Sequence, residues 1–148
     1  MTEVPRRLLL DTNVFIIGYL DLDSPEAKLL EGIASLDIIL IFSNDLEEQI
    51  RRVGRRLLNK DWVGQILFRI WHDYQIEYIQ ITPVELDHLD KVADIPREDV
   101  GIYLTAIRGQ AQCFISANRQ LLKDASAKQN LFECLRAEDF LVKYLTPS

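Results

Sequence analysis

Acidic and amide side chains follow several apolar runs of this sequence, at or shortly after the point where each run ends. Asp11 comes directly after the first run, Glu47 and Glu48 lie one helical turn past the second, and Asn118 follows a later one. Asp99 opens a segment with helical spacing. In an open α/β sheet the carboxyl ends of the strands share one edge, so these residues could meet in one cleft.

Clustered carboxylates without a basic partner repel one another, and a divalent cation removes that conflict. Oxygen ligands such as carboxylates, an amide carbonyl and water suit Mg²⁺ or Mn²⁺. An ion held in this way can activate water and stabilise the negative charge that builds on a phosphate. The pattern therefore indicates metal-dependent hydrolysis of a phosphate ester.

Other hydrolytic chemistries lack their residues here. The sequence has no Ser/His/Asp or Cys/His pattern, no glycine loop for phosphates and no zinc motif. Cys113 and Cys134 are not spaced as metal ligands and are predicted to be buried thiols, while His72 and His88 lie among charged residues and are predicted to face solvent. A phosphatase with a DxD-type nucleophile motif would need a second acid at position 13, which is Asn13.

The elements that must position these residues alternate along the chain. Short apolar runs at 7–10, 38–43, 76–81, 113–116 and 131–135 predict five strands. Helical spacing or helix-start signals between them predict helices over about 14–20, 24–34, 46–58, 62–71, 82–92 and 98–109, with a last helix around 140–144. Strands that alternate with helices predict one α/β domain over 1–148, with three α/β/α layers and a central, mostly parallel five-stranded sheet.

Composition and charge narrow the function further. The 148 residues are 48% hydrophobic and 27% charged, as in an ordinary globular domain. No apolar stretch approaches the roughly 20 residues of a membrane span, and the first residues have no signal-peptide layout, so we expect a cytoplasmic protein without a membrane partner. Trp62, Trp71 and Tyr74 lie at helical spacing and are predicted to pack in the core rather than to stack on bases.

The net charge of −6 argues against a general nucleic-acid binder. A local basic block nevertheless stands just past the second acidic position, and either a solvated helix face or a binding surface would account for it. The block consists of Arg51, Arg52, Arg55, Arg56 and Lys60.

The order of these features resembles that of a PIN domain, the fold of many metal-dependent ribonucleases, including the toxins of VapC type. Leu8–Asn13 resembles the family's opening strand and first acid, and Ile41–Ser43 followed by Glu47 and Glu48 resembles its second motif. Asp99–Ala106 is similar to the third motif and Cys113–Asn118 to the fourth. The resemblance extends to the closing helix, which Ala137–Leu141 would form, and so covers nearly the whole chain.

The resemblance implies an endoribonuclease in which water attacks an RNA phosphodiester with the help of Mg²⁺ or Mn²⁺. Asp11 and Asp99 would bind the metal, Glu48 or Glu47 would hold the metal or its water, and Asn118 would complete the ligand set. Leu46, two residues before Glu48, favours Glu48. The residues expected to orient these ligands are Thr12, Asn13 and Ser116, and those expected to hold the RNA backbone are Arg51, Arg52, Arg55, Arg56 and Lys60.

The chain departs from the family pattern at Asn118, where the family commonly has Asp. An amide oxygen can bind a hard cation but brings no negative charge, so weaker metal binding is expected, and Asp124 is not expected to substitute. Asn118 thus favours the alternative of a PIN-like module without catalysis that binds RNA or a partner protein. The resemblance to VapC-like toxins further implies an antitoxin partner and a homodimer.

Overall fold

The structure, a computed structural model, describes residues 3–92 and 95–146, so residues 1–2, 93–94 and 147–148 of the predicted domain lie outside the described part. The strands are β1 (Arg7–Leu10), β2 (Ile39–Ser43), β3 (Gln75–Ile79), β4 (Cys113–Ile115) and β5 (Glu133–Leu135). The α-helices are α1 (Thr12–Leu20), α2 (Pro25–Ala34), α3 (Asn44–Leu57), α4 (Lys60–Asp73), α5 (Pro83–Val92), α6 (Val100–Arg108), α7 (Arg119–Lys128) and α8 (Ala137–Phe140). A 3₁₀ turn, η1 (Arg97–Asp99), precedes α6, and a π-helical turn, η2 (Leu141–Leu145), follows α8.

The strands form one sheet in the order β3-β2-β1-β4-β5, and every pairing is parallel. Leu9 of β1 lies opposite Ile41 of β2 on one side and Phe114 of β4 on the other, and all three are buried. Central strands of a parallel sheet are covered on both faces, which is why these runs are apolar at every position. The predicted α/β architecture with a five-stranded parallel sheet is confirmed.

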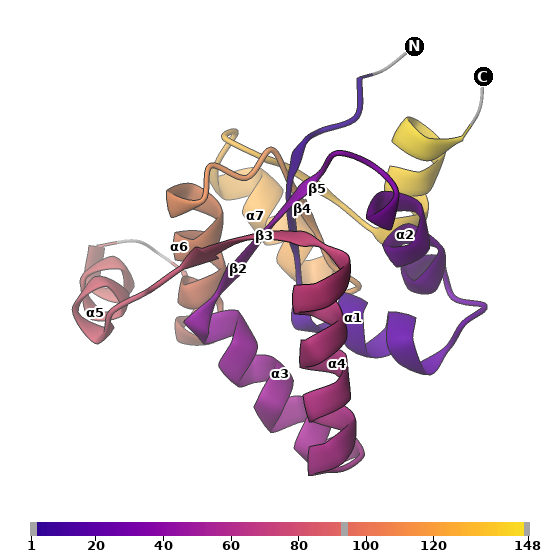
Figure 1. Ribbon diagram of the computed structural model, residues 1–148. Coiled ribbons are helices and arrows are strands. Elements are labelled where there is room, and N and C mark those ends of the chain that lie inside the picture. Colours follow the sequence, from indigo (N-terminus) through magenta and orange to yellow (C-terminus); the bar gives the residue numbers. More distant parts are fainter. Residues whose placement is uncertain (1–2, 93–94, 147–148) are drawn as a thin grey trace.

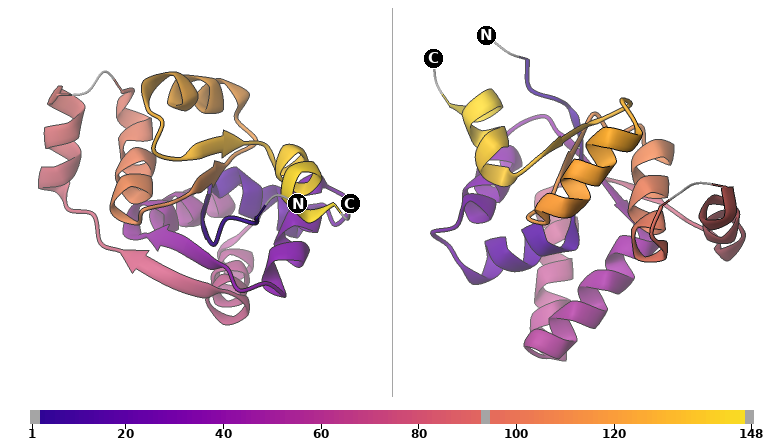
Figure 2. Two further views of the ribbon diagram at one scale, coloured as in Figure 1. Left: turned by 90° about the horizontal axis from the view of Figure 1, so that it is seen from above. Right: turned by 180° about the vertical axis from the view of Figure 1, so that it is seen from behind.

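Helices cover both faces of the sheet. α1, α2 and α4 lie on one face, α6 and α7 lie on the other, and α5 packs outside α6 (Figures 1 and 2). α3 projects from the carboxyl end of β2, with α4 returning beside it (Figure 1). The opposite placement of the two helix sets follows from right-handed crossovers, because the chain moves outward through β2 and β3 and then returns across the sheet to β4 and β5.

Local signals in the sequence start α2 and α5 within one residue of the predicted positions, whereas α1, α3, α4 and α6 each start two residues away from them. The Ser24 hydroxyl accepts a hydrogen bond from the Ala27 amide at 3.0 Å and caps α2. Thr82 and Glu85 form the predicted capping box, since each side chain accepts from the other residue's amide, at 3.2 and 3.3 Å. Capping of this kind satisfies amides that the first turn of a helix leaves without partners.

Two predicted strands are shorter than expected because side chains take over their backbone hydrogen bonds. Beyond β3, the Ile81 amide donates to Asn44 Oδ1 at 2.7 Å and the Ile81 carbonyl accepts from Asn44 Nδ2 at 2.9 Å. Before β5, the amides of Leu131 and Phe132 both donate to Gln129 Oε1. Side-chain amides that bind the backbone in this way compete with sheet pairing.

The predicted core position is wrong for Trp71, whose side chain is 46% exposed. It packs from outside against Phe42 and Tyr78, with ring centroids 6.1 and 5.6 Å away, because β3 is the edge strand beside it. Trp62 and Tyr74 are half-buried. No helix in the described part of the chain combines the length and the apolar character that crossing a membrane requires.

The sheet order reverses between β1 and β4, which are neighbours although β2 and β3 come between them in the sequence. Open α/β sheets bind ligands in the crevice outside the carboxyl ends of the strands at such a point. Asp11 and Ser116 are the residues that directly follow β1 and β4. The backbone also joins them, since the Asp11 amide donates to the Ile115 carbonyl at 2.9 Å.

Candidate functional site

Asp11 is fixed by the turn that starts α1. Its carboxylate accepts hydrogen bonds from the Thr12 amide and the Ser116 hydroxyl, both at 2.8 Å, and more weakly from Asn13 Nδ2 at 3.4 Å. The side chain is buried, and this burial raises the pKa of the carboxyl despite the three donors. Ser116, Asn13 and Thr12, the three residues expected to orient the ligands, thus all hydrogen-bond to the Asp11 carboxylate, Thr12 through its backbone amide.

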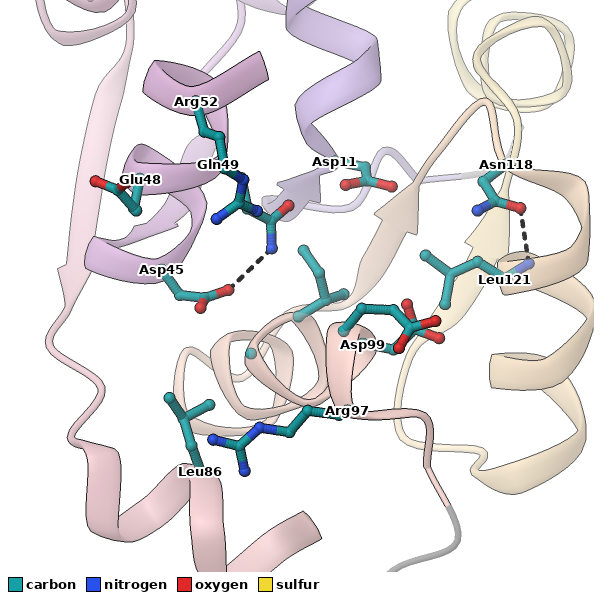
Figure 3. Close-up of a pocket in the computed structure, with 13 residues that line it drawn as sticks. Asp11, Asp45, Glu48, Gln49, Arg52, Leu86, Arg97, Asp99, Asn118 and Leu121 are labelled. Carbon is teal, nitrogen blue, oxygen red and sulfur yellow. Dashed lines mark hydrogen bonds between the residues drawn. The ribbon is translucent and has the colours of Figure 1, made fainter.

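A cavity of about 460 Å³ lies outside the carboxyl ends of β1 and β4, and all four predicted principal residues line it (Figure 3). Asp11 comes from β1, Glu48 from α3, Asp99 from the start of α6 and Asn118 from the start of α7. The other lining residues are Asp45, Gln49, Arg52, Leu86, Arg97, Glu98, Gly101, Ile102 and Leu121. Residues more than 100 positions apart in the sequence therefore share one wall.

Asp99 is half-buried at the junction of η1 and α6. Desolvation by burial raises the pKa of its carboxyl, and the negative charges of Glu98, Asp11 and Asp124 raise it further. Asp124 is therefore near enough to act on Asp99 through its charge, but it does not line the cavity. The repulsion between Asp99 and Asp11 is the electrostatic conflict that the sequence predicted for clustered acids.

Of the two neighbouring glutamates, Glu48 faces the cavity and Glu47 does not. Glu47 forms an ion pair with Arg51 at 3.3 Å on another face of α3. It lies near Tyr78, whose phenol pKa is raised by burial and then by the Glu47 charge. Glu48 is therefore the only one of the pair at the cavity wall.

The sequence did not single out Gln49 and Asp45, which lie near the turn that holds Asp11. Thr12 Oγ1 donates to Gln49 Oε1 at 3.1 Å, and Gln49 Nε2 donates to Asp45 Oδ2 at the same distance. Burial raises the pKa of the Asp45 carboxyl. Their spacing was a usable signal, because positions 45, 49 and 52 share one helix face opposite the buried Leu46 and Ile50.

Buried hydroxyls join the start of α3 to α6. The Leu46 amide donates to Ser43 Oγ at 3.1 Å, and Ser43 Oγ is hydrogen-bonded to Thr105 Oγ1 at 2.8 Å. Thr105 Oγ1 in turn donates to the Gly101 carbonyl at 2.7 Å. This chain fixes the helix that carries Glu48 relative to the helix that begins at Asp99.

Gly101 permits a close approach of α6 to α3, because a Cβ there would overlap the Asp45 carboxylate. The Asp45 carboxylate is the end of a flexible side chain that can turn away, so Gly101→Ala is expected to break the hydrogen bond between Asp45 and Gln49 and to change the free energy of unfolding by no more than about 1 kcal/mol. Urea denaturation measures this change. The double variant Gly101→Ala/Asp45→Ala has no carboxylate to displace and should be at least as stable as Asp45→Ala. A double variant that is less stable than Asp45→Ala by more than about 1 kcal/mol would show that the carboxylate is not what limits the approach of the two helices.

The predicted basic block does not face the cavity as a unit. Arg52 lines the cavity, whereas Arg51 pairs with Glu47 and Arg55 Nε donates to the Arg51 carbonyl at 3.2 Å. Arg56 and Lys60 are exposed and do not line the cavity. A second cation does line it, Arg97 of η1, and no motif in the sequence marked this residue because its position depends on how η1 meets α5.

Asn118 caps α7. Its Oδ1 accepts a hydrogen bond from the Leu121 amide at 3.1 Å (Figure 3). Its backbone amide donates to Ser116 Oγ at 3.0 Å. A carbonyl-type oxygen has two acceptor sites, so the cap leaves one of them for a further partner. The side chain is exposed at the cavity edge.

The side chains that line the cavity supply carboxylate and amide oxygens, and these ligand atoms suit a hard divalent cation. Among the residues that the structure describes, no group of three or more His, Cys, Asp or Glu side chains is arranged to hold one metal ion. Mg²⁺ is usually held by only one or two carboxylates, with water and substrate phosphates as its other ligands. The pair Asp11 and Asp99, which act on each other through their charges, fits that mode of binding.

Comparison of the sequence with protein-family models and with curated proteins finds no match. Among solved structures, the fold is similar to a chain of VapBC2 from Rickettsia felis, in the crystal structure of VapBC2 bound to a DNA fragment from the promoter. The TM-score is 0.63 at 15% sequence identity, and the match covers 88% of this chain and 98% of that one. At this identity the similarity concerns the fold alone, and that fold is the α/β arrangement with a five-stranded parallel sheet predicted from the sequence.

Proposed function

We propose that this chain is a Mg²⁺- or Mn²⁺-dependent endoribonuclease that acts in the cavity at the carboxyl ends of β1 and β4. The observation that carries the proposal is that Asp11, Glu48, Asp99 and Asn118, chosen from four separate stretches of sequence, line this one cavity. Burial that raises the pKa of Asp11 and Asp99 supports a functional site, since perturbed carboxyls in a cleft cluster at such sites.

In this proposal Asp11 and Asp99 hold the cation, and Asn118 contributes its free acceptor site. The cation would supply a Lewis acid for the phosphodiester and balance the charge of the carboxylates. Ser116 and Thr12 keep the Asp11 oxygens directed into the cavity by their hydrogen bonds. Glu48 of α3 would hold the cation or its water in this proposal, and its place in the cavity lining supports this role.

A non-catalytic module that binds RNA or a partner protein is the second candidate. The observation in its favour is that amides occupy two positions around Asp11, Gln49 beside Thr12 and Asn118 beside Ser116. Amides hydrogen-bond to carboxylates without adding negative charge, so they reduce the need for a cation. Calorimetric titration with Mn²⁺ separates the two candidates, because only the first predicts heat of binding that Asp99→Asn abolishes.

The similarity to a VapBC2 chain supports a more specific version of the proposal, in which the chain is a cytoplasmic toxin paired with an antitoxin and forms a homodimer. Growth arrest on expression, relieved by the product of a neighbouring gene, would support this version. Expression without effect on growth would leave an RNA-cleaving enzyme outside any toxin–antitoxin pair.

Removal of the metal tests the enzyme directly. The purified chain is expected to cut single-stranded RNA with Mn²⁺ or Mg²⁺ and to lose this activity in EDTA, with recovery when Mn²⁺ is returned in excess. Cleavage that persists in EDTA would contradict a metal-dependent site.

The two amides are expected to limit the activity. Gln49→Glu and Asn118→Asp each add a carboxylate next to the proposed metal site, so we expect tighter Mn²⁺ binding and a rise in cleavage of about tenfold for each. Gln65→Glu, on the exposed surface of α4 outside the cavity, adds the same charge and serves as the control. Unchanged metal affinity in both cavity variants would show that neither amide faces the cation.

A further inference from the structure

We infer that Arg52 and Arg97 bind two phosphates of a single-stranded RNA at the cavity, so that the strand runs from α3 to η1 along one side of the acidic centre. The inference rests on the proposed function for the identity of the polymer. It goes beyond that function because it assigns the strand's path, its single-stranded form and a residue, Arg97, far in sequence from the basic block.

The two arginines enter the cavity from different elements (Figure 3). Arg52 lies on α3, one turn beyond Gln49, and Arg97 lies in η1, two residues before Asp99. In Figure 3 the Arg97 side chain extends from η1 toward Leu86 of α5, on the same side of the pocket as Asp45 and Arg52 of α3. A chain of phosphates that runs along this side, past Asp11 and Asp99, would therefore meet both guanidinium groups.

The charge of the cavity requires such contacts. Its described lining carries the carboxylates of Asp11, Asp45, Glu48, Glu98 and Asp99 against only two guanidinium groups. A cation at Asp11 and Asp99 would serve the phosphate being cut, but the flanking phosphates of a polyanion would still meet Asp45 and Glu98. Arg52 and Arg97 are the cations in the lining that can offset this repulsion, and guanidinium groups bind phosphate oxygens with two parallel hydrogen bonds.

Arg97 is held in position before any ligand binds. Its Nη1 lies 3.1 Å from Asp87 Oδ1 and 3.4 Å from Asp90 Oδ2, both on α5, while 55% of the side chain stays exposed. A guanidinium has five N–H donors, so contacts at Nη1 leave other donors for a phosphate. Arg52 is exposed on α3, and its charge lowers the pKa of the nearby Asp45 carboxyl against the larger effect of burial.

The size of the cavity favours a single strand. Its volume of about 460 Å³ lies in the range of pockets that enclose a small ligand, which is the scale of an unpaired nucleotide and not of a helix. Leu86, Ile102 and Leu121 add apolar surface to the walls against which a base can pack. Proteins read double-stranded RNA differently, from contacts spread along its grooves, and a cavity of this size does not offer such a surface.

The test measures binding without cleavage. A fluorescent single-stranded RNA of about ten nucleotides is titrated in EDTA, and anisotropy gives the Kd at several salt concentrations. We expect Arg52→Ala and Arg97→Ala each to raise Kd about tenfold and to reduce the slope of log K against log salt by about 0.7, the value for one phosphate contact on a single strand. Arg52→Lys and Arg97→Lys should keep most of the slope while losing affinity, because lysine keeps the charge but not the planar fork.

Arg55→Ala is the matched control, since Arg55 belongs to the same basic block but contacts the Arg51 carbonyl outside the cavity. Its Kd should stay within about twofold of the wild type, as for surface substitutions away from a site. A duplex of the same sequence should bind at least about tenfold more weakly than the single strand. Circular dichroism of each variant establishes that it is folded.

The inference would be overturned by unchanged affinity in both cavity variants, by an equal loss in Arg55→Ala, or by equal binding of duplex and single strand. A wild-type chain that binds no single-stranded RNA would overturn it as well. The proposed nuclease function fails separately. RNA bound through Arg52 and Arg97 but never cut with Mn²⁺ would refute that function alone, and RNA cut equally well by wild type, Arg52→Ala and Arg97→Ala would refute the inference alone.

Discussion

Asp11→Asn is expected to lower Mn²⁺-dependent RNA cleavage by at least about 100-fold while the chain still folds. The substitution keeps the shape of the side chain and an oxygen that can accept from the Thr12 amide, which now donates to the carboxylate at 2.8 Å. It removes a negative charge from the position that we propose as the first metal ligand. The loss corresponds to several kcal/mol of transition-state stabilisation, the scale on which a bound cation acts.

The folded state should tolerate this change. Burial raises the pKa of the Asp11 carboxyl, which means that the fold disfavours the charged form. An uncharged amide avoids that cost but loses the hydrogen bond that Ser116 Oγ donates to the second carboxylate oxygen, so the free energy of unfolding at pH 7 is expected to fall by no more than about 1–2 kcal/mol. A variant that is inactive because it is unfolded would be recognised by its circular dichroism.

Asp37→Asn controls for the loss of one carboxylate. Asp37 is 74% exposed and pairs with Arg6 on the surface, and it does not line the cavity, so cleavage should be unchanged. Asp99→Asn should repeat the loss seen with Asp11→Asn. Activity within a few-fold of the wild type in both cavity variants would show that the site is assigned to the wrong residues.

Phe42→Ala is expected to lower the free energy of unfolding by about 3–5 kcal/mol, a large part of the roughly 5–15 kcal/mol that stabilises a typical domain. Phe42 is fully buried in β2 and meets the rings of Phe15, Trp71 and Tyr78 at centroid distances of 6.2, 6.1 and 6.3 Å. Truncation would leave a cavity between the sheet and α1, which the rigid strands cannot close. Urea denaturation measures the loss, and we expect the melting temperature to fall by roughly 10 °C.

Phe68→Ala is the matched control for Phe42→Ala. The same side chain is removed from α4, but Phe68 is 68% exposed and stacks only on His72 at the surface. Its cost should stay within about 0.5 kcal/mol, as for most surface substitutions. Similar losses in both variants would show that the core does not depend on Phe42.

Local sequence predicted the elements of the fold well because their signals are local. Continuous apolar runs such as Leu8–Leu10 identify strands buried on both faces, and caps such as Ser24 set helix starts within one residue. The ends of β3 and β5 were wrong because they depend on Asn44 and Gln129, whose side-chain bonds to distant or adjacent backbone have no periodic signal. Trp71 was misplaced because spacing indicates a helix face but not whether another layer covers it.

The sequence by itself determined the acids Asp11 and Asp99 and the amide Asn118 as site residues. A residue at the end of a parallel strand or at the start of a helix lies at a known edge of the sheet. Only the tertiary structure decided which side chains share the cavity. It placed Glu48 inside and Glu47 outside, brought Gln49 to the turn that holds Asp11, and added Arg97 from η1. The physical reason is that the direction of a helical side chain depends on how its helix is rotated about its own axis. Contacts of Ser43, Thr105 and Gly101, which are far apart in the sequence, set that rotation for α3.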